Sequence, residues 1–360
     1  MFTTIRLQHF RSYADESIEL GPGVSIVVGP NASGKTNLLE SLLVLARGKS
    51  YRASDEELVQ FKKSWARLDG QLDDGSTRTV KLEQDPSGKT LKSYVIDELP
   101  YVRLTHQRQL PVVLFEPEHL RLLHGSPESR RNFLDDLLEQ SDPGFGTVRN
   151  HYKRALAQRN SLLKQSNHRN DQLFVWNLRL SELGAYIADA RRQLIDTIND
   201  SIPKIYSGIA GKKSTVEVVY KSSIESPSYS TGLLKKLEAS VHQDMLRGFT
   251  SHGPHRDDFT ALLNSHPVAA SASRGETRSL LLSLKVIETR VIEQVHGRKP
   301  LLLLDDVFSE LDGARRHALT KIVDGYQTII TTTDADAVVE HFLESDYKII
   351  PTQTKASKRG

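Results

Sequence analysis

The sequence predicts an α/β fold that begins with antiparallel β structure and carries a helical insertion in its middle. Apolar and polar residues alternate near the N-terminus and again over Arg67 to Val95, which is typical of half-buried strands. From about Pro117 to Ser207 the apolar residues recur at helical spacing. Helices and strands then alternate after Thr277, which indicates that α/β order returns.

The N-terminal part is predicted to consist of short strands around one amphipathic helix. The helix follows Lys35 and ends near Gly48, because leucines recur there at spacings of three and four. The turn signals Asp74-Gly75 and Pro86-Ser87-Gly88 predict antiparallel hairpins. The strands expected in this part lie around Ile5 and Leu7, at Phe10, at Ile18 and Leu20, and over Ser25 to Val28, Arg67 to Val95 and Val112 to Phe115.

The middle of the chain is predicted to form a short helical hairpin. A helix containing Tyr152 to Leu163 is separated by the polar stretch Gln165 to Gln172 from a helix with a heptad seam. The seam consists of Leu173, Trp176, Leu180, Leu183, Ile187, Ala190 and Leu194. The elements expected downstream are a strand at Val216 to Tyr220, helices over Leu233 to Leu246 and Thr277 to Val295, a strand at Leu301 to Leu304, a helix over Arg315 to Val323, a strand at Thr328 to Thr331, a helix over Ala335 to Leu343 and a strand at Tyr347 to Ile349.

Composition excludes several kinds of protein and of site. Of the 360 residues 38% are hydrophobic and 26% are charged, as in ordinary globular domains. Aliphatic runs such as Leu42 to Ala46 are far shorter than the ~20 residues of a membrane helix. Met1 to Leu20 lacks the apolar core of a secretory signal, so a cytoplasmic location is expected. The absence of cysteine excludes disulfides and thiolate sites, so any metal must be bound by oxygen or imidazole.

The positive charge is concentrated in the middle of the chain. The formal net charge is only +3, from 48 lysines and arginines against 45 aspartates and glutamates. Between Thr147 and Thr250 there are 16 basic against 9 acidic residues, so this segment is positive and the remainder is negative. A solvated helical face is the simplest interpretation of such an imbalance, and a nucleic-acid contact is the alternative.

One loop matches a phosphate-binding pattern at every fixed position. The run Gly29-Pro30-Asn31-Ala32-Ser33-Gly34-Lys35-Thr36 fits G-x-x-x-x-G-K-[ST], with a β-branched strand before it and the amphipathic helix after it. The backbone N–H groups of this loop are expected to bind phosphate, with Lys35 reaching the β and γ phosphates. Thr36 is expected to bind Mg²⁺ through its hydroxyl. The sequence therefore predicts a nucleotide site at residues 29–36.

Two acidic residues follow the predicted strand Leu301 to Leu304. Asp305 is expected to bind the Mg²⁺ ion, usually through water, and Asp306 to orient or deprotonate the attacking water. The alternative for Asp306 is that it caps the helix that follows.

A further motif, Ser273-Arg274-Gly275-Glu276, opens the helix that begins at Thr277. These residues can simply cap a helix. However, the order of P-loop, Ser-x-Gly-Glu, Leu-Leu-Asp-Asp and Ser309-Glu310-Leu311-Asp312 resembles the order of motifs in ABC-type ATPases. In that class the Ser-x-Gly-Glu motif faces the γ-phosphate held by a second subunit. The resemblance implies that Ser273, Gly275, Glu276 and Asp312 bind ATP across a dimer, with Ser273, Lys35 and Asp306 as the catalytic residues. Where such ATPases usually have a switch histidine, Ile330 to Asp334 offers only threonine hydroxyls.

Four longer stretches resemble the RecF family of bacterial recombination mediator ATPases. They are Pro117 to Pro127 continuing into Arg130 to Asp135, Leu303 to Asp312, Gly253 to Asp258, and Phe10-Arg11-Ser12-Tyr13. The resemblance implies a P-loop ABC-type ATPase head of residues 1–116 and 248–360, with an N-terminal antiparallel β subdomain. The inserted helical second lobe, with its short helical hairpin, would comprise residues 117–247.

The same resemblance implies a weak ATPase that uses ATP and Mg²⁺ to dimerise on double-stranded DNA near single-strand gaps. Slow hydrolysis would release the DNA, and RecR and RecO would act with the protein to load RecA. The basic segment then becomes a candidate for phosphate contacts. The expected contacts are Arg149, Lys153, Arg154, Arg159, Lys212 and Lys213. For Arg130 and Arg131, contact with DNA or nucleotide and pairing with Asp135 or Asp136 both stay open.

Two other functions remain as alternatives. The ATPase subunit of a transporter would need an apolar docking groove, whereas the insertion here is basic and longer. A stand-alone P-loop NTPase would use Ser273 and Gly275 only to cap a helix.

Overall fold

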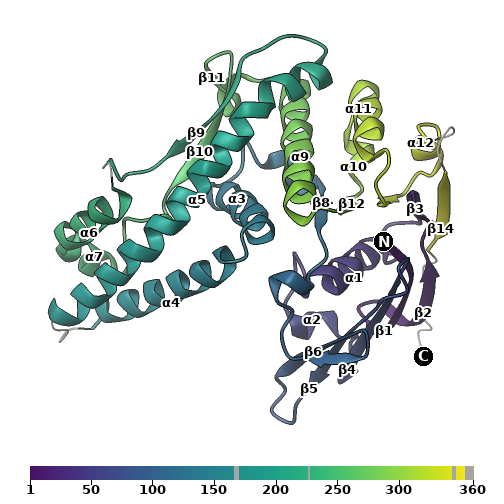
Figure 1. Cartoon of the computed structure of the whole chain (residues 1–360), viewed down its shortest axis with the longest axis horizontal. Helices are drawn as coiled ribbons and strands as arrows, with labels where there is room; N and C mark the ends of the chain where they lie inside the picture. Colours follow the sequence, from purple (N-terminus) through teal and green to yellow (C-terminus); the bar gives the residue numbers. More distant parts are fainter. Residues whose placement is uncertain (166–169, 226–227, 343–345, 353–360) are drawn as a thin grey trace. The chain divides into compact units, whose positions relative to one another are not determined.

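The computed structural model describes residues 1–165, 170–225, 228–342 and 346–352, which form two compact units (Figure 1). Unit 1 comprises Met1–His119 and Glu288–Gly360, and unit 2 comprises Leu120–Ile287. The first boundary lies close to the expected one at residue 117. The chain returns to unit 1 at residue 288 rather than at 248, because strand β10 (Asp258–Leu263) pairs with β9 (Val216–Lys221) inside unit 2.

A parallel sheet forms the centre of unit 1. Its strand order is β14-β3-β13-β12-β8, and every neighbouring pair is parallel. Strands β12 and β13 are buried along their whole length, as expected for a parallel sheet covered on both faces. The carboxyl ends of β3, β12 and β13 lie at one edge of the sheet, which is where open α/β sheets bind ligands. The five strands are β3 (Val24–Val28), β8 (Val112–Phe115), β12 (Leu301–Asp305), β13 (Thr328–Thr332) and β14 (Tyr347–Pro351).

An antiparallel sheet of six strands, in the order β2-β1-β4-β5-β6-β7, forms the second layer of unit 1. Helix α1 (Lys35–Arg47) contacts strands of both sheets, and its leucines join them in one hydrophobic core. This burial accounts for the many leucines of the helix. The strands are β1 (Phe2–Phe10), β2 (Tyr13–Glu19), β4 (Trp65–Leu72), β5 (Thr77–Gln84), β6 (Thr90–Ile96) and β7 (Leu99–Tyr101). The smaller elements are α2 (Asp55–Leu58), η1 (His106–Arg108), α10 (Val307–Glu310), α11 (Gly313–Val323) and α12 (Asp336–Val339).

Unit 2 combines helices with a three-stranded antiparallel sheet in the order β11-β10-β9. The long helix α5 (Asn170–Ala210) contacts α3, α4, α6 and β9 (Figure 1). The other elements are α3 (Pro127–Ser141), α4 (Phe145–Leu163), α6 (Tyr229–Ala239), α7 (Val241–Arg247), β11 (His266–Pro267) and α8 (Val268–Ser271), with η2 (Pro117–Arg121) and α9 (Arg274–His296) spanning the two boundaries. In the part of the chain that the structure describes, none of the helices is both long and apolar enough to cross a membrane.

Most of the predicted elements are present, two of them differ, and one strand was not predicted. The predicted helix over Leu233 to Leu246 is two helices, because the chain breaks at Ser240 between α6 and α7. The helix predicted from Ala335 is reduced to α12, and its expected end at Leu343 lies outside the described residues. Strand β10 was not predicted, although its buried residues alternate with half-buried ones, and it pairs with the predicted strand β9.

A buried ion pair connects three helices of unit 2. Arg159 of α4 is fully buried and donates to Asn177 of α5 at 2.7 Å, and to Asp244 of α7 at 2.8 Å. It also donates to Thr250 Oγ1 at 2.8 Å and to the Leu237 carbonyl at 3.2 Å. With four hydrogen bonds to four partners, the guanidinium is bound inside the protein, so Arg159 holds elements of unit 2 together instead of facing solvent.

We expect Arg159→Leu to lower the free energy of unfolding of unit 2 by roughly 3–5 kcal/mol, because Asp244 would keep a buried charge without its partner. Arg154→Leu, on the exposed side of the same helix, should change it by less than about 0.5 kcal/mol. Urea unfolding followed by the fluorescence of Trp176 in α5, in a Trp65→Phe background, measures both. Equal losses in the two variants would contradict the structural role of Arg159.

Candidate nucleotide-binding site

The phosphate-binding loop lies between β3 and α1, as the sequence predicts. Gly34 adopts φ of 98° immediately before the helix, a conformation that favours glycine. A Cβ atom there would also lie 2.8 Å from Ser12 Oγ. The Tyr13 hydroxyl donates to the Gly34 carbonyl at 3.1 Å. Residues of the stretch Phe10 to Tyr13 therefore hold the end of the loop from the antiparallel sheet.

Lys35 lies back across this loop. Its Nζ atom donates to the carbonyls of Gly29 at 2.8 Å and Pro30 at 3.0 Å. Burial lowers the pKa of Lys35, and the nearby carboxylates of Asp306 and Asp305 oppose that shift. A cation next to a helix N-terminus is the combination that binds phosphate groups, so the loop fits the predicted nucleotide.

Asp305 lies at the end of β12 and is 8% exposed. Its Oδ1 atom accepts hydrogen bonds from Thr36 Oγ1 at 3.1 Å and from Thr331 Oγ1 at 2.7 Å. The Tyr51 hydroxyl lies 3.3 Å from Oδ2. A hydroxyl and a carboxylate side by side are the oxygen ligands that Mg²⁺ prefers, so Thr36 and Asp305 fit the ion that the sequence predicts.

Asp306 has φ of 53° and donates its backbone N–H to Thr331 Oγ1 at 2.9 Å. Thr331 thus connects the two acidic residues, in the segment where the sequence offers no histidine. Within the described part of the chain, the Asp306 carboxylate does not cap a backbone N–H of α10. The capping alternative therefore lacks its hydrogen bond.

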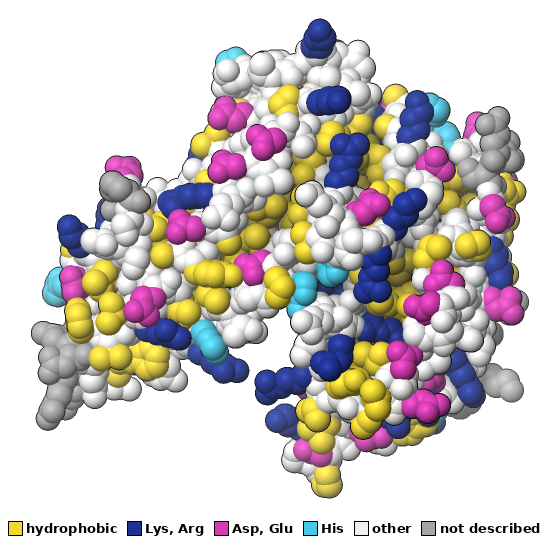
Figure 2. Space-filling view, in the orientation of Figure 1, with side chains coloured by type: hydrophobic (Ala, Val, Ile, Leu, Met, Phe, Trp, Pro, Cys, Tyr) yellow, Lys and Arg dark blue, Asp and Glu magenta, His cyan; other side chains and the backbone are white. Residues whose placement is uncertain are grey.

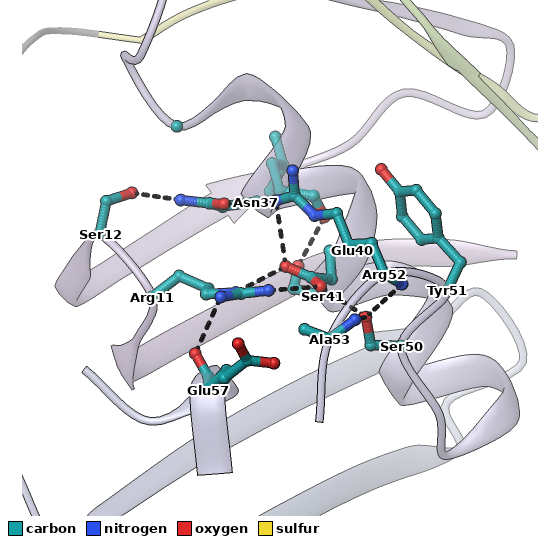
Figure 3. Close-up of polar contacts among 12 residues, drawn as sticks. Arg11, Ser12, Asn37, Glu40, Ser41, Ser50, Tyr51, Arg52, Ala53 and Glu57 are labelled. Atoms are coloured by element: carbon teal, nitrogen blue, oxygen red, sulfur yellow. Dashed lines mark hydrogen bonds and ion pairs between the residues drawn. The ribbon is translucent and has the colours of Figure 1, made fainter. Parts of the chain in front are cut away.

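A second polar network lies on α1 and was not predicted (Figure 3). Glu40 is fully buried and accepts two bonds from Arg11, at 2.8 and 2.9 Å, one from Arg52 at 3.2 Å and one from Ser50 at 2.5 Å. Burial alone would raise the pKa of Glu40, but the bonds from Arg11, Ser50 and Arg52 lower it overall. The one feature of the sequence that could have indicated this network is Glu40 itself, a single carboxylate within a leucine-rich helix.

Tyr51 follows this network and connects it to Asp305. Burial, and next the charge of Asp305, raise the pKa of Tyr51, so its hydroxyl stays protonated and donates. The Arg52 guanidinium lies 5.7 Å from the Tyr51 ring centre.

The Ser-x-Gly-Glu motif lies at the start of α9 in unit 2 and forms a capping box. Ser273 donates through its N–H and its hydroxyl to Glu276, both at 2.9 Å, and the Glu276 N–H donates to Ser273 Oγ at 3.3 Å. Lys212 donates to Glu276 at 2.7 Å, and this bond, followed by those from Ser273, lowers the pKa of Glu276 to about 2. Ser273 is nonetheless exposed, so capping leaves it accessible.

Asp312 caps a helix in the same way. Its Oδ1 atom accepts the Arg315 N–H at 3.1 Å at the start of α11. The structure thus brings residues 29–36 together with Asp305 and Asp306 in unit 1, whereas Ser273, Gly275 and Glu276 belong to unit 2.

Two of the expected DNA contacts are wrong. Arg159 is fully buried in its ion pair with Asp244, so it is not accessible to a phosphate. The Arg149 side chain is 14% exposed and is paired with Asp135 and Glu139. Helical spacing alone did not separate these inward-facing arginines from the exposed face. The residues that do lie on the surface are Lys153, Arg154, Lys212 and Lys213. On the face that Figure 2 shows, both basic and acidic side chains of the described residues lie at the surface.

Arg130 and Arg131 have partners other than those expected on their own helix. Arg130 forms a bidentate pair with Asp258, at 2.7 and 2.8 Å, and Arg131 donates to the Asp257 carbonyl at 2.9 Å. Asp135 is bound instead by Arg191 of α5, at 2.8 and 3.0 Å. The stretch around Gly253 to Asp258 is therefore held inside unit 2 by arginines.

Comparison with known proteins finds RecF proteins both among sequence relatives and among solved structures. The model of the RecF/RecN/SMC N terminal domain matches residues 1–358. The DNA replication and repair protein RecF of Bacillus cytotoxicus is 36% identical over 348 residues, which is 94% of this chain and 92% of the relative.

Solved structures agree. The recombination mediator protein RecF-ATPrS of the RecFOR pathway is 28% identical, with a TM-score of 0.86 over 99% of this chain and 98% of the other. The Smc head domain of Pyrococcus furiosus, bound to part of ScpA, is 16% identical with a TM-score of 0.51 over 97% and 92%, which is a likeness of fold alone. The predicted α/β fold of a P-loop ATPase head is thereby confirmed. Because the family model and the RecF relative both cover almost the whole length, the chain belongs to the RecF family.

Proposed function

We propose that this chain is an ATP-dependent DNA-binding clamp of recombinational gap repair. The observation that carries the proposal is the contact of Thr36 with Asp305, which joins the phosphate-binding loop to the carboxylate that follows β12. A RecF relative is described with an ATP analogue in the RecFOR pathway, and others as DNA replication and repair proteins, which supports ATP and DNA as ligands.

The residues of unit 1 would bind and orient the nucleotide. The loop N–H groups and Lys35, whose Nζ atom lies across the loop on the Gly29 and Pro30 carbonyls, would bind the phosphates, and Thr36 and Asp305 would hold the Mg²⁺ ion. The ion, when bound, would neutralise charge on the β and γ phosphates. Asp306, whose backbone N–H donates to Thr331 and whose carboxylate lies 3.4 Å from the Ser309 hydroxyl, would accept a proton from the attacking water or orient it. A threonine in place of a switch histidine fits slow hydrolysis, as a weak ATPase requires.

The second half of each site would come from another copy of the chain. Ser273 and Gly275 are placed at a helix N-terminus whose serine is exposed, which suits contact with a γ-phosphate held by a partner. ATP would then hold two chains together on double-stranded DNA near a gap, and hydrolysis would release them. RecR and RecO are the partners with which the chain would help to load RecA. DNA phosphates would contact Lys153, Arg154, Lys212 and Lys213 on the surface of unit 2.

Ser273→Arg is expected to abolish ATP-dependent dimerisation and hydrolysis but to leave ATP binding by each chain unchanged, because the loop and Asp305 are untouched. Sedimentation with ATP and Mg²⁺ measures the dimer, and a binding titration measures ATP affinity. Thr197→Arg, an added cation at an exposed position of α5, serves as the control. If the Ser273 variant still dimerises and turns over, Ser273 only caps α9 and the chain acts alone.

Asp306→Asn is expected to lower the rate of ATP hydrolysis roughly 10²-fold or more, since it removes the proposed proton acceptor. ATP binding should remain, so the ATP-bound dimer should accumulate. Phosphate release and sedimentation on the same samples test both parts, with the exposed Asp324→Asn as control. Unchanged phosphate release would exclude Asp306 from the chemical step.

Arg154→Glu is expected to weaken DNA binding uniformly across sequences. It should also reduce the slope of log K against log salt by about one, because one DNA phosphate fewer is neutralised by the protein. Fluorescence anisotropy of labelled duplex DNA between low and physiological salt gives both values. Lys321→Glu on the exposed side of α11 is the charge-matched control. The same salt dependence in both variants would remove Arg154 from the DNA interface.

A further inference from the structure

The Asp305 carboxylate is held from both sides by hydroxyl groups. Thr331 and Thr36 donate to Oδ1, and Tyr51 donates to Oδ2 at 3.3 Å. Thr331 belongs to the neighbouring strand of the same sheet, and Thr36 to the phosphate-binding loop and α1. Tyr51 comes from neither: it lies in the segment between α1 and α2. The orientation of the Oδ2 atom therefore depends on a segment outside the loop and the sheet.

This segment is fixed by Glu40. The Ser50 hydroxyl donates to Glu40 at 2.5 Å and accepts the N–H groups of Arg52 and Ala53, both at 3.1 Å (Figure 3). The Arg52 side chain donates to Asn37 at 2.7 Å and to Glu40 at 3.2 Å. Both sides of Tyr51 are thus bound to α1, so its ring has a defined position next to Asp305.

Glu40 also binds the antiparallel sheet. Arg11, in the turn between β1 and β2, forms the bidentate pair with Glu40 and donates to the Glu57 carbonyl at 2.9 Å. One buried carboxylate therefore connects that turn, α1 and the Tyr51 segment. A carboxylate so far inside the core is stable only because all of its partners are in place.

We propose that Tyr51 is a positioning residue for Asp305, held in place through Ser50 and Glu40. The inference rests on the proposed function, because it concerns the carboxylate that would bind the Mg²⁺ ion of the nucleotide. A carboxylate held at one oxygen can rotate about its last side-chain bond, and a donor to the second oxygen restricts that rotation. Groups that orient a metal-binding side chain typically change metal affinity by 10–100-fold. The 3.3 Å distance favours the lower end of that range.

Tyr51→Phe removes the hydroxyl and keeps the ring. We expect the Mg²⁺ concentration for half-maximal binding of a fluorescent, slowly hydrolysed ATP analogue to rise roughly tenfold in the full-length chain. The affinity for the same analogue in EDTA should stay the same, since the phosphate contacts are unchanged. A merely structural effect would change both values together.

Tyr94→Phe is the matched control. The Tyr94 hydroxyl also makes a 3.3 Å bond to an acceptor near α1, but that acceptor is the Gly48 carbonyl at the opposite end of the helix. The Mg²⁺ dependence of nucleotide binding by Tyr94→Phe should equal that of the wild type. A Tyr51→Phe chain whose Mg²⁺ dependence matches the wild type or shifts no further than Tyr94→Phe overturns the inference.

Ser50→Ala tests the route through Glu40. It should raise the required Mg²⁺ concentration in the same direction, and the double variant with Tyr51→Phe should shift it no further than Tyr51→Phe alone. Additive shifts would mean that the Ser50 turn does not act through Tyr51. A wild-type chain that binds no Mg²⁺-nucleotide overturns the proposed function together with this inference, whereas wild-type binding with an unshifted Tyr51→Phe overturns the inference alone.

Discussion

The candidate site depends on the hydrogen bonds that hold Asp305. Thr36 brings the phosphate-binding loop to this carboxylate, and Thr331 brings the neighbouring strand β13. Since Thr331 also accepts the Asp306 N–H, a single hydroxyl sets both acidic residues at the sheet edge. The parallel register makes this possible, because Asp305 lies opposite Thr331 in the pairing of β12 with β13. A shift of one residue would turn the Asp305 side chain to the other face of the sheet.

Helix α1 is the second constraint, and it acts through burial. Its leucines are enclosed by the parallel sheet and the antiparallel sheet, so the helix cannot move without disturbing both layers. Its N-terminus carries the phosphate-binding loop, which is braced by the Tyr13 hydroxyl on Gly34. The hydrogen bonds of Glu40 add directional contacts to this packing, and they restrict rotation of α1 about its axis. The loop is therefore presented on a rigid support, as precise ligand binding requires.

Residue spacing and turn-forming residues were enough to predict elements whose conformation depends on neighbouring residues in the sequence. The loop at residues 29–36, the strand Leu301 to Leu304 and the helical seam from Leu173 to Leu194 followed from spacing and turn chemistry. What could not be predicted is long-range pairing: that Arg159 meets Asp244 or that Arg130 meets Asp258. From the sequence, Arg159 was predicted to lie on the surface and the role of Arg130 stayed open, because an inward-facing arginine has the same sequence signature as an outward-facing one. The network of Glu40 was missed for the same reason, because its partners come from the β1–β2 turn and from the segment after α1.

The buried arginines also change how the positive charge of the middle segment is understood. Part of that charge neutralises carboxylates inside unit 2, where Arg159, Arg191 and Arg149 bind Asp244 and Asp135. Buried pairs of this kind contribute little to the electric field outside the protein, since each charge is cancelled at close range. Attraction of a DNA backbone would then depend on the exposed residues alone, such as Arg154 and Lys213. In the proposed clamp, two chains joined by ATP would present these exposed residues twice and would bind DNA more tightly than one chain.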